Sequence, residues 1–110
     1  MSSKTALVIL AEGAEEMETV ILVDILRRAK IDVTLASLTD TPNVTCSRQV
    51  VLVADCPLST VQGKVFDAVV LPGGGKGAEN LANSNEVGAI LKNHDSQVRV
   101  EQCMARFSFL

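Results

Sequence analysis

Short aliphatic runs alternate with amphipathic segments along most of this chain. Residues 6–10 and 65–71 are largely apolar, which is typical of buried strands, and residues 32–38 are rich in Val, Thr and Leu, which is typical of strands. Residues 15–30 and about 84–94 have helical patterns, and the first of these begins with acidic and ends with basic side chains, as the helix dipole favours. This order of strands and helices predicts a parallel α/β sheet.

The segments between these elements carry weaker signals. Residues 39–43 are a cluster of turn residues, and residues 44–53 are expected to form a short hairpin or a strand with an edge extension. Residues 55–63 are expected to be a loop, and residues 78–81 a single helical turn. Ser84 has the residue type of an N-cap and should begin the last helix.

One side of the helix over residues 15–30 is expected to pack on the sheet. At about 100° per residue, that side carries Glu18, Leu22, Ile25 and Ala29, with Leu26 beside them. Burial raises the pKa of a carboxyl group and a helix N-terminus lowers it, so Glu18 is a candidate general acid or base. The alternative is that Glu18 lies at the rim of the helix and extends into water.

The other side of this helix is also largely apolar. It carries Met17, Val20, Ile21, Asp24 and Arg28, of which the last two are spaced as an i,i+4 ion pair. One sheet covers only one side of a helix, so the surplus is expected to face a second subunit. The alternative is a helix buried between two layers of the same chain.

A glycine-rich loop, Leu-Pro-Gly-Gly-Gly-Lys-Gly at residues 71–77, follows the third aliphatic run. It lacks the spacing of a Walker A loop, and an alanine replaces the last glycine of the dinucleotide motif. Backbone N–H groups in such a loop, at the carboxyl end of a strand, can converge on an oxyanion. The alternative is a flexible turn.

Composition excludes several classes of protein. Apolar residues make up 47% of the chain and charged residues 21%, which excludes a disordered protein. With three Phe, no Trp or Tyr and a net charge of −3, the chain is not expected to bind nucleic acid. No aliphatic run approaches the ~20 residues of a membrane span. No secretory signal is recognisable either, so a cytoplasmic protein is expected.

The cysteines and the single histidine point to no metal site. Cys46, Cys56 and Cys103 are widely spaced, which fits neither a disulfide framework nor a zinc cluster. Reduced thiols, no metal and no cofactor are therefore expected. His94 lies in a polar helix end and is expected to be solvated.

Several segments together form a recognisable set. They are Ala-Leu-Val-Ile-Leu-Ala at 6–11, Gly-Ala-Glu-Glu-Met-Glu-Thr-Val at 13–20, Arg-Arg-Ala at 27–29, Ile-Asp-Val-Thr at 31–34, Cys-Ser-Arg at 46–48 and Val-Val-Leu-Pro-Gly-Gly at 69–74. This set resembles the DJ-1/PfpI superfamily, and within it the animal branch of Parkinson-disease protein deglycases. The resemblance runs from about residue 4 to residue 92 and covers about the first half of a typical family member.

The resemblance implies a flavodoxin-like α/β sandwich with a parallel sheet that forms a homodimer. It implies a protein deglycase or glyoxalase with a nucleophilic, oxidation-sensitive cysteine, acting on a small dicarbonyl or a glycated substrate. It also implies roles in the oxidative stress response, as a redox sensor and as a chaperone. The compartment would be the cytoplasm, with the nucleus and mitochondria as further possibilities.

The resemblance also implies residue roles. Glu18 is the acid/base partner of the cysteine, and the N–H groups of Gly73 and Gly74 hold the developing oxyanion. Arg28 and Arg48 line the mouth of the pocket near the dimer contact. The helix side with Met17, Val20 and Ile21 is the dimer interface. Cys46, near that contact, is a small thiol whose oxidation is a further possibility.

The end of the chain departs from the family. Residues 97–106 read Gln-Val-Arg-Val-Glu-Gln-Cys-Met-Ala-Arg, where the family has an apolar strand and a glycine elbow that carries the nucleophile. Counting from the glycine loop puts Ala105 at the nucleophile position, so Cys103 is either a displaced nucleophile or a free thiol. The chain is therefore divided into a partial DJ-1/PfpI domain, residues 1–96, and a divergent tail, residues 97–110.

Two functions follow from this division. The first is a cysteine-dependent enzyme that uses Cys103, Glu18 and the glycine loop on a dicarbonyl. The second is a non-catalytic truncated form that dimerises with, or competes with, a full-length subunit.

Overall fold

The computed structural model describes the backbone of residues 4–97 and the side chains of residues 4–93. The main sheet has four parallel strands in the order β5-β2-β1-β6. These strands are β1 (Thr5–Leu10), β2 (Asp32–Ser37), β5 (Cys56–Pro57) and β6 (Ala68–Val70). The predicted parallel α/β sheet is confirmed, and every residue of β1 from Ala6 onwards is buried.

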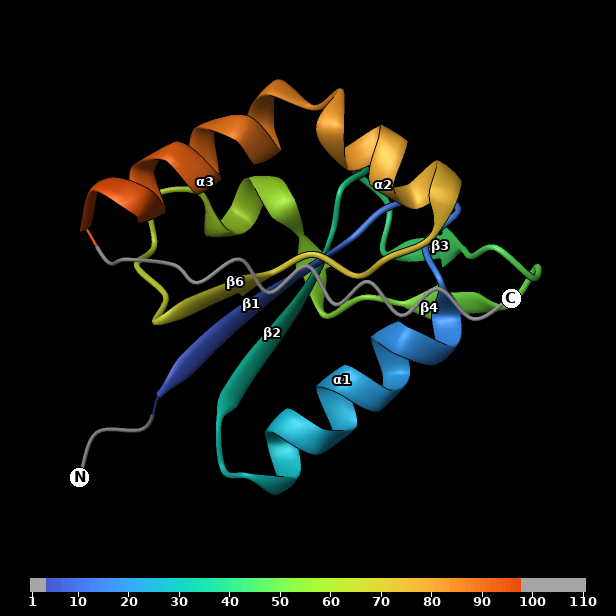
Figure 1. Ribbon diagram of the computed structural model, residues 1–110, viewed down its shortest axis with the longest axis horizontal. Helices are drawn as coiled ribbons and strands as arrows, with labels where there is room; N and C mark the ends of the chain where they lie inside the picture. The colour runs from blue at the N-terminus through green and yellow to red at the C-terminus, as the bar shows by residue number, and fades with distance from the viewer. Residues whose placement is uncertain (1–3, 98–110) are drawn as a thin grey trace.

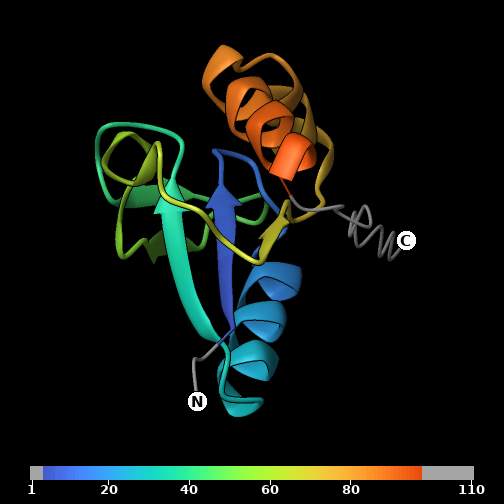
Figure 2. The same cartoon turned by 90° about the vertical axis from the view of Figure 1, so that its left-hand side faces the viewer.

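Helices cover both faces of this sheet (Figures 1 and 2). α1 (Glu16–Arg28) lies on one face, while α2 (Gly75–Ala82) and α3 (Asn85–Gln97) lie on the other. The buried side chains divide in the same way. The cluster on the α2–α3 side includes Leu7, Ile9, Val69, Leu81 and Val87. The cluster on the α1 side includes Ala6, Val8, Val23, Val33 and Val70.

The buried side of α1 is rotated by about 80° from the predicted one, at about 100° per residue. Its centre is the line of Thr19 and Leu26, whereas Ile25 is 58% exposed and Ala29 is also exposed. The prediction that Ile25 and Ala29 pack on the sheet is therefore wrong. Thr19 can occupy the centre because its hydroxyl donates a hydrogen bond to the Glu15 carbonyl at 2.9 Å, which satisfies a buried polar group.

The segment after β2 contains more regular structure than predicted. β3 (Asn43–Thr45) and β4 (Val51–Val53) form an antiparallel hairpin, which was one of the two predicted arrangements. The expected loop at residues 55–63 instead contains β5 and the 3₁₀-helix η1 (Leu58–Val61). Leu58 and Val61 are both buried, because residues three apart share one face of a 3₁₀-helix.

The structure defines where the last two helices begin. α2 has two turns rather than the single predicted turn, since it starts at Gly75, within the glycine loop. α3 begins after Ser84, whose Oγ accepts a hydrogen bond from the Val87 N–H at 3.2 Å, so the predicted N-cap is confirmed. β6 is shorter than predicted because Val65 is 62% exposed and lies outside the sheet.

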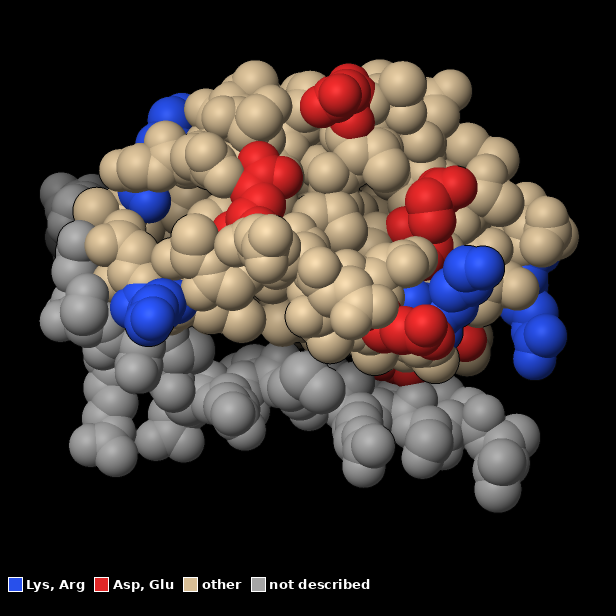
Figure 3. Space-filling model, turned by 90° about the horizontal axis from the view of Figure 1, so that it is seen from above, with Lys and Arg blue, Asp and Glu red and all other residues tan. Residues whose placement is uncertain are grey.

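Seen from the α2–α3 side, charged side chains are scattered over a largely uncharged surface (Figure 3). Within residues 4–97, no helix combines the length and the hydropathy that crossing a bilayer requires.

Candidate functional site

Two loops are in close contact at the carboxyl ends of β1 and β6, namely the segment that joins β1 to α1 and the glycine loop that follows β6. The Glu15 N–H donates a hydrogen bond to the Gly73 carbonyl at 2.9 Å, which joins the start of α1 to the glycine loop. Gly74 has a φ of +108°, and a Cβ there would lie 2.7 Å from the Glu15 nitrogen. Only glycine allows this approach, because both the backbone angle and the contact exclude a side chain.

Glu18 is held in this junction by the first turn of α1. Its side chain is only 8% exposed, and Oε1 accepts a hydrogen bond from the Gly73 N–H at 3.2 Å. The alternative of a rim position open to water is therefore wrong. The predicted burial of Glu18 at the strand ends is confirmed, while its role as an acid/base partner stays a prediction.

The surroundings of Glu18 raise the pKa of its carboxyl group. Burial is the largest cause, because it penalises the charged form. The hydrogen bond from Gly73 acts in the opposite direction, and the nearby negative charge of Glu15 raises the pKa further. A carboxyl group with a raised pKa is better placed to give and take a proton near neutral pH.

The two predicted oxyanion donors differ in the structure. The Gly73 N–H already donates to Glu18, so an anion would compete with that carboxylate for it. The Gly74 N–H has no hydrogen-bond partner within the described part of the chain, and it lies at the N-cap of α2. Gly74 is thus the donor available in this state, and the oxyanion role of the loop stays a prediction.

The sequence pattern gives no sign of the role that Glu16 has in the structure. Its buried carboxylate accepts hydrogen bonds from Ser47 Oγ at 2.8 Å and from the Arg48 N–H at 2.9 Å, and a longer one from the Val50 N–H at 3.4 Å. Burial raises the pKa of Glu16, but these hydrogen bonds outweigh it and lower the pKa to about 2. The carboxylate therefore fastens the β3–β4 turn to the start of α1.

Cys46 lies behind this turn and is 2% exposed. Burial, together with the negative charges of Glu16, Glu12 and Glu15, raises the pKa of its thiol to about 11. The thiol is therefore protonated near neutral pH, and a protonated, buried thiol reacts slowly with oxidants. Its oxidation stays a prediction that these surroundings disfavour.

Arg28 and Arg48 lie in separate parts of the structure within one chain. Arg28 pairs with Asp24 at 2.7 Å, and this contact raises the pKa of its guanidinium. It lies ten residues after Glu18 on α1, or about 15 Å along the helix axis. Arg48 is exposed in the β3–β4 turn, where its backbone binds Glu16. A shared pocket mouth formed by both arginines stays a prediction, and it would need a second chain to supply Arg28.

The outer side of α1 is apolar and exposed, as the helical wheel predicts. Met17 and Val20 are each 50% exposed and Ile21 is 51% exposed. Within residues 4–97, no second layer covers this side of the helix, so the alternative of a helix buried between two layers is not found in the described part of the chain. An interface at these three residues stays a prediction.

The remaining candidates lie at or beyond the end of the described chain. Cys103, Ala105 and the rest of residues 98–110 lie outside the described residues, as does the side chain of His94. Between residues 4 and 93, no three His, Cys, Asp or Glu side chains are grouped so as to hold a metal ion.

Comparison with known proteins identifies the family. Residues 4–102 match the DJ-1/PfpI family. The Parkinson disease protein 7 homolog of Danio rerio is 50% identical over 99 residues, covering 88% of this chain and 52% of that protein. The glutathione-independent glyoxalase DJR-1.2 of Caenorhabditis elegans is 36% identical over 92 residues, covering 83% of this chain and 48% of that protein.

The fold comparison agrees. The crystal structure of Drosophila melanogaster DJ-1beta superimposes with a TM-score of 0.85 at 49% identity, covering 86% of this chain and 51% of that chain. The chain belongs to the DJ-1/PfpI family and has its flavodoxin-like fold. It spans about half the length of the relatives that it matches.

Proposed function

We propose that this chain carries the acid/base and oxyanion half of a DJ-1-type site that converts a small dicarbonyl. The observation that carries the proposal is the junction of Glu18 with the glycine loop, where burial raises the pKa of the carboxyl group. The relation to a glutathione-independent glyoxalase supports the substrate class. Neither Glu18 nor the loop requires a cofactor for this chemistry.

In the proposed reaction, the Cys103 thiolate adds to the aldehyde carbon of a 2-oxoaldehyde, and the Gly74 N–H stabilises the oxyanion that forms. Glu18 then moves the aldehyde proton to the neighbouring carbonyl carbon. Water releases the thiol and a 2-hydroxy acid. The aldehyde carbon is oxidised while the ketone carbon is reduced, so the conversion consumes one water and needs no external oxidant.

Turnover of methylglyoxal by the purified full chain tests this proposal. Replacing a general acid/base costs about 10²- to 10⁴-fold in rate, so Glu18→Gln should lower kcat/KM at least about 100-fold. Cys103→Ser should abolish turnover. Glu79→Gln, which changes an exposed carboxylate on α2, is the matched control and should leave the rate unchanged. No turnover by the unaltered chain, or full activity of Cys103→Ser, would refute the proposal.

A second function is favoured by the exposed outer side of α1. Here the chain acts as a non-catalytic subunit that pairs with a second copy or with a full-length family member through Met17, Val20 and Ile21. Burying three half-exposed aliphatic side chains supplies a favourable free energy of association.

Size-exclusion chromatography after co-expression with a full-length family member tests this pairing. A mixed dimer should form with the unaltered chain and should be lost with Ile21→Glu. Val65→Glu, which changes an exposed valine outside α1, should leave the dimer intact. Separate peaks for the two unaltered proteins, with this chain eluting as a monomer, would reject the pairing.

A further inference from the structure

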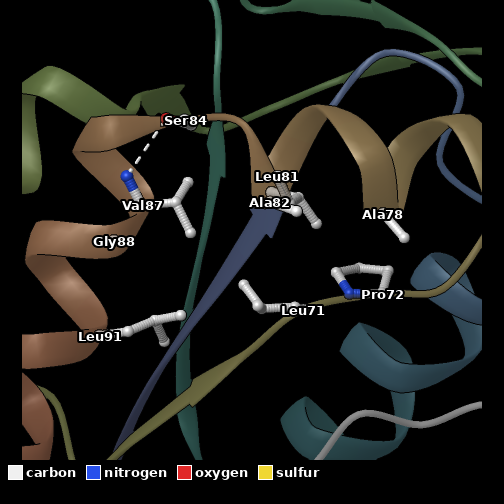
Figure 4. Close-up of a pocket in the computed structure, with 9 residues that line it drawn as sticks. All are labelled: Leu71, Pro72, Ala78, Leu81, Ala82, Ser84, Val87, Gly88 and Leu91. Carbon is white, nitrogen blue, oxygen red and sulfur yellow. Dashed lines mark hydrogen bonds between the residues drawn. The ribbon is translucent and has the colours of Figure 1, made fainter.

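The glycine loop after β6 is fixed on both sides of its first two glycines. Pro72 and Ala78 line the same apolar cavity of about 200 Å³, and their side chains point towards each other (Figure 4). The Gly73 N–H donates a hydrogen bond to Glu18, and the Gly74 carbonyl accepts one from the Ala78 N–H at 2.7 Å. These contacts leave open only the orientation of the peptide group between Gly73 and Gly74.

This peptide group has two possible orientations. Gly73 and Gly74 both lack a Cβ, so rotation of the peptide group between them meets little steric resistance. The peptide bond is trans, so its carbonyl and its N–H point in opposite directions. One orientation therefore offers the Gly74 N–H to an anion, while the reverse orientation offers the Gly73 carbonyl, which repels an anion.

A hydrogen bond from the start of α1 selects the first orientation. The Glu15 N–H donates to the Gly73 carbonyl at 2.9 Å, so this carbonyl faces α1 and the Gly74 N–H points away from the Glu15 nitrogen. Gly74 then has a φ of +108°, and reversal of the peptide group would turn this φ to a negative value. A hydrogen bond of ordinary strength changes such an equilibrium about 2- to 10-fold.

The peptide group between Ala14 and Glu15 is itself held from its other side. Its carbonyl accepts a hydrogen bond from the Ser47 N–H at 2.8 Å, and Ala14 is fully buried. Ser47 is in turn fixed by Glu16, whose carboxylate accepts a hydrogen bond from Ser47 Oγ at 2.8 Å. Two hydrogen-bonded peptide groups thus lead from the β3–β4 turn to the Gly74 N–H, and hydrogen bonds in such a chain strengthen one another.

We propose that Glu15 is a positioning residue whose backbone N–H, held by the β3–β4 turn through Ala14, keeps the Gly74 N–H in the orientation that binds an oxyanion. We call this chain, from the Ser47 N–H through Ala14–Glu15 to Gly73–Gly74, the peptide relay. Its function rests on the oxyanion role proposed above for Gly74. The relay acts through the backbone of Glu15 and does not require the Glu15 carboxylate.

Replacing the Glu15 N–H by an ester oxygen tests the relay in the full chain. A synthetic segment of residues 1–45 that carries the ester is joined at Cys46 to a ¹⁵N-labelled segment of residues 46–110, so every side chain is kept. The measurement is nuclear magnetic resonance of the couplings between the Gly74 amide proton and its two Hα protons, because these couplings depend on φ.

The ester should reverse the peptide group. Its oxygen faces the Gly73 carbonyl oxygen and repels it, whereas the original N–H attracts it. The Gly74 couplings should therefore change from those of a φ of +108° towards those of a negative φ. The population of the reversed orientation should rise at least about twofold.

Two controls separate the Glu15 N–H from other effects. An ester at Asp32 removes the hydrogen bond from the Asp32 N–H to the Lys4 carbonyl, also of 2.9 Å, at the amino ends of β1 and β2. Glu15→Ala keeps the N–H and removes the carboxylate that accepts a hydrogen bond from the Met17 N–H at 2.9 Å. Both chains should keep the Gly74 couplings of the unaltered chain.

Unchanged couplings in the Glu15 ester, or an equal change in the Asp32 ester, would overturn the proposal. Titration of the unaltered chain with sodium formate is the independent measurement. Formate should shift the Gly74 amide resonance more than that of Gly73, whose N–H is bound to Glu18, and an equal or smaller shift would also overturn it.

These measurements need no turnover, so the relay can hold in an inactive chain. Changed couplings in a Glu15 ester that converts methylglyoxal at the full rate would support the relay and refute the oxyanion role of Gly74. Unchanged couplings in an active chain would refute the relay alone.

Discussion

Gly77 is the point where α2 passes closest to the segment that joins β1 to α1. A Cβ at this position would lie 2.6 Å from the Ala14 Cα and 2.8 Å from the Ala14 nitrogen. Both atoms belong to the backbone of a fully buried residue, so no side-chain rotation relieves the contact. Gly77→Ala must therefore push α2 away from the junction that holds Glu18.

The cost can be estimated from two opposing effects. Forcing an extra methyl group into a packed site costs about 1–3 kcal/mol, and a contact with backbone at this distance lies towards the upper end. Replacing glycine by alanine inside a helix contributes about 0.8–1 kcal/mol in the opposite direction. Gly77→Ala should therefore lower the free energy of unfolding by about 1–2 kcal/mol.

Two other helical glycines are matched controls. A Cβ at Gly75 or at Gly88 would meet nothing within 4 Å. Gly88→Ala should therefore raise the free energy of unfolding by about 0.5–1 kcal/mol, and Gly75→Ala, at the first position of α2, by less.

Urea denaturation followed by far-ultraviolet circular dichroism measures all three variants. Gly77→Ala and Gly88→Ala should change the free energy of unfolding in opposite directions. If Gly77→Ala were as stable as Gly88→Ala, the two loops would not be in tight contact, and the account of the junction around Glu18 would be wrong.

Three further changes test other contacts. Glu16→Gln should abolish the part of the pH dependence of protein stability that arises because the pKa of Glu16 is lowered from 4.5 to about 2. The stabilisation by the carboxylate is complete above the ordinary pKa and is lost as the pH falls towards about 2. The melting temperatures of the variant and the unaltered chain should therefore become equal near that pH. Asp55→Ala removes the carboxylate that binds the Leu35 N–H and the Arg27 guanidinium, each at 2.9 Å, and should cost about 0.5–1.5 kcal/mol in urea denaturation. Ser84→Ala should cost about 1 kcal/mol in the same assay, whereas Ser84→Gly should cost only a few tenths.

The elements that the sequence predicts well are those in which one physical effect dominates. β1 and β2 begin and end within one residue of their predicted limits. In β1 a continuous aliphatic run matches burial on both faces, and in β2 the Val, Thr and Leu residues favour a strand. The length of α2 is underestimated from the sequence, since glycine is a poor helix former when only propensity is considered. In the structure, Gly77 is needed for the close passage beside Ala14, and this tertiary contact decides where the helix lies.

Long-range contacts explain why the role of Glu16 in the site could not be predicted from the sequence. The helical wheel put Glu18 on an apolar side of the helix, which left either burial or a rim position open, and the structure shows burial. Glu16 lies two residues earlier and gives no such signal, since its partners are in the β3–β4 turn, more than thirty residues away. The two carboxylates show opposite pKa shifts, because one accepts a single backbone hydrogen bond and the other accepts several.

The two proposed functions can fail separately. Dicarbonyl conversion requires that the Cys103 thiol reach the carboxyl ends of the strands, where Glu18 and Gly73 meet. Pairing through α1 requires only the exposed side of that helix with Met17, Val20 and Ile21. A chain that pairs with a full-length family member but does not turn over methylglyoxal would therefore act as a non-catalytic subunit. An active chain that elutes as a monomer would show that the chemistry does not depend on the outer side of α1.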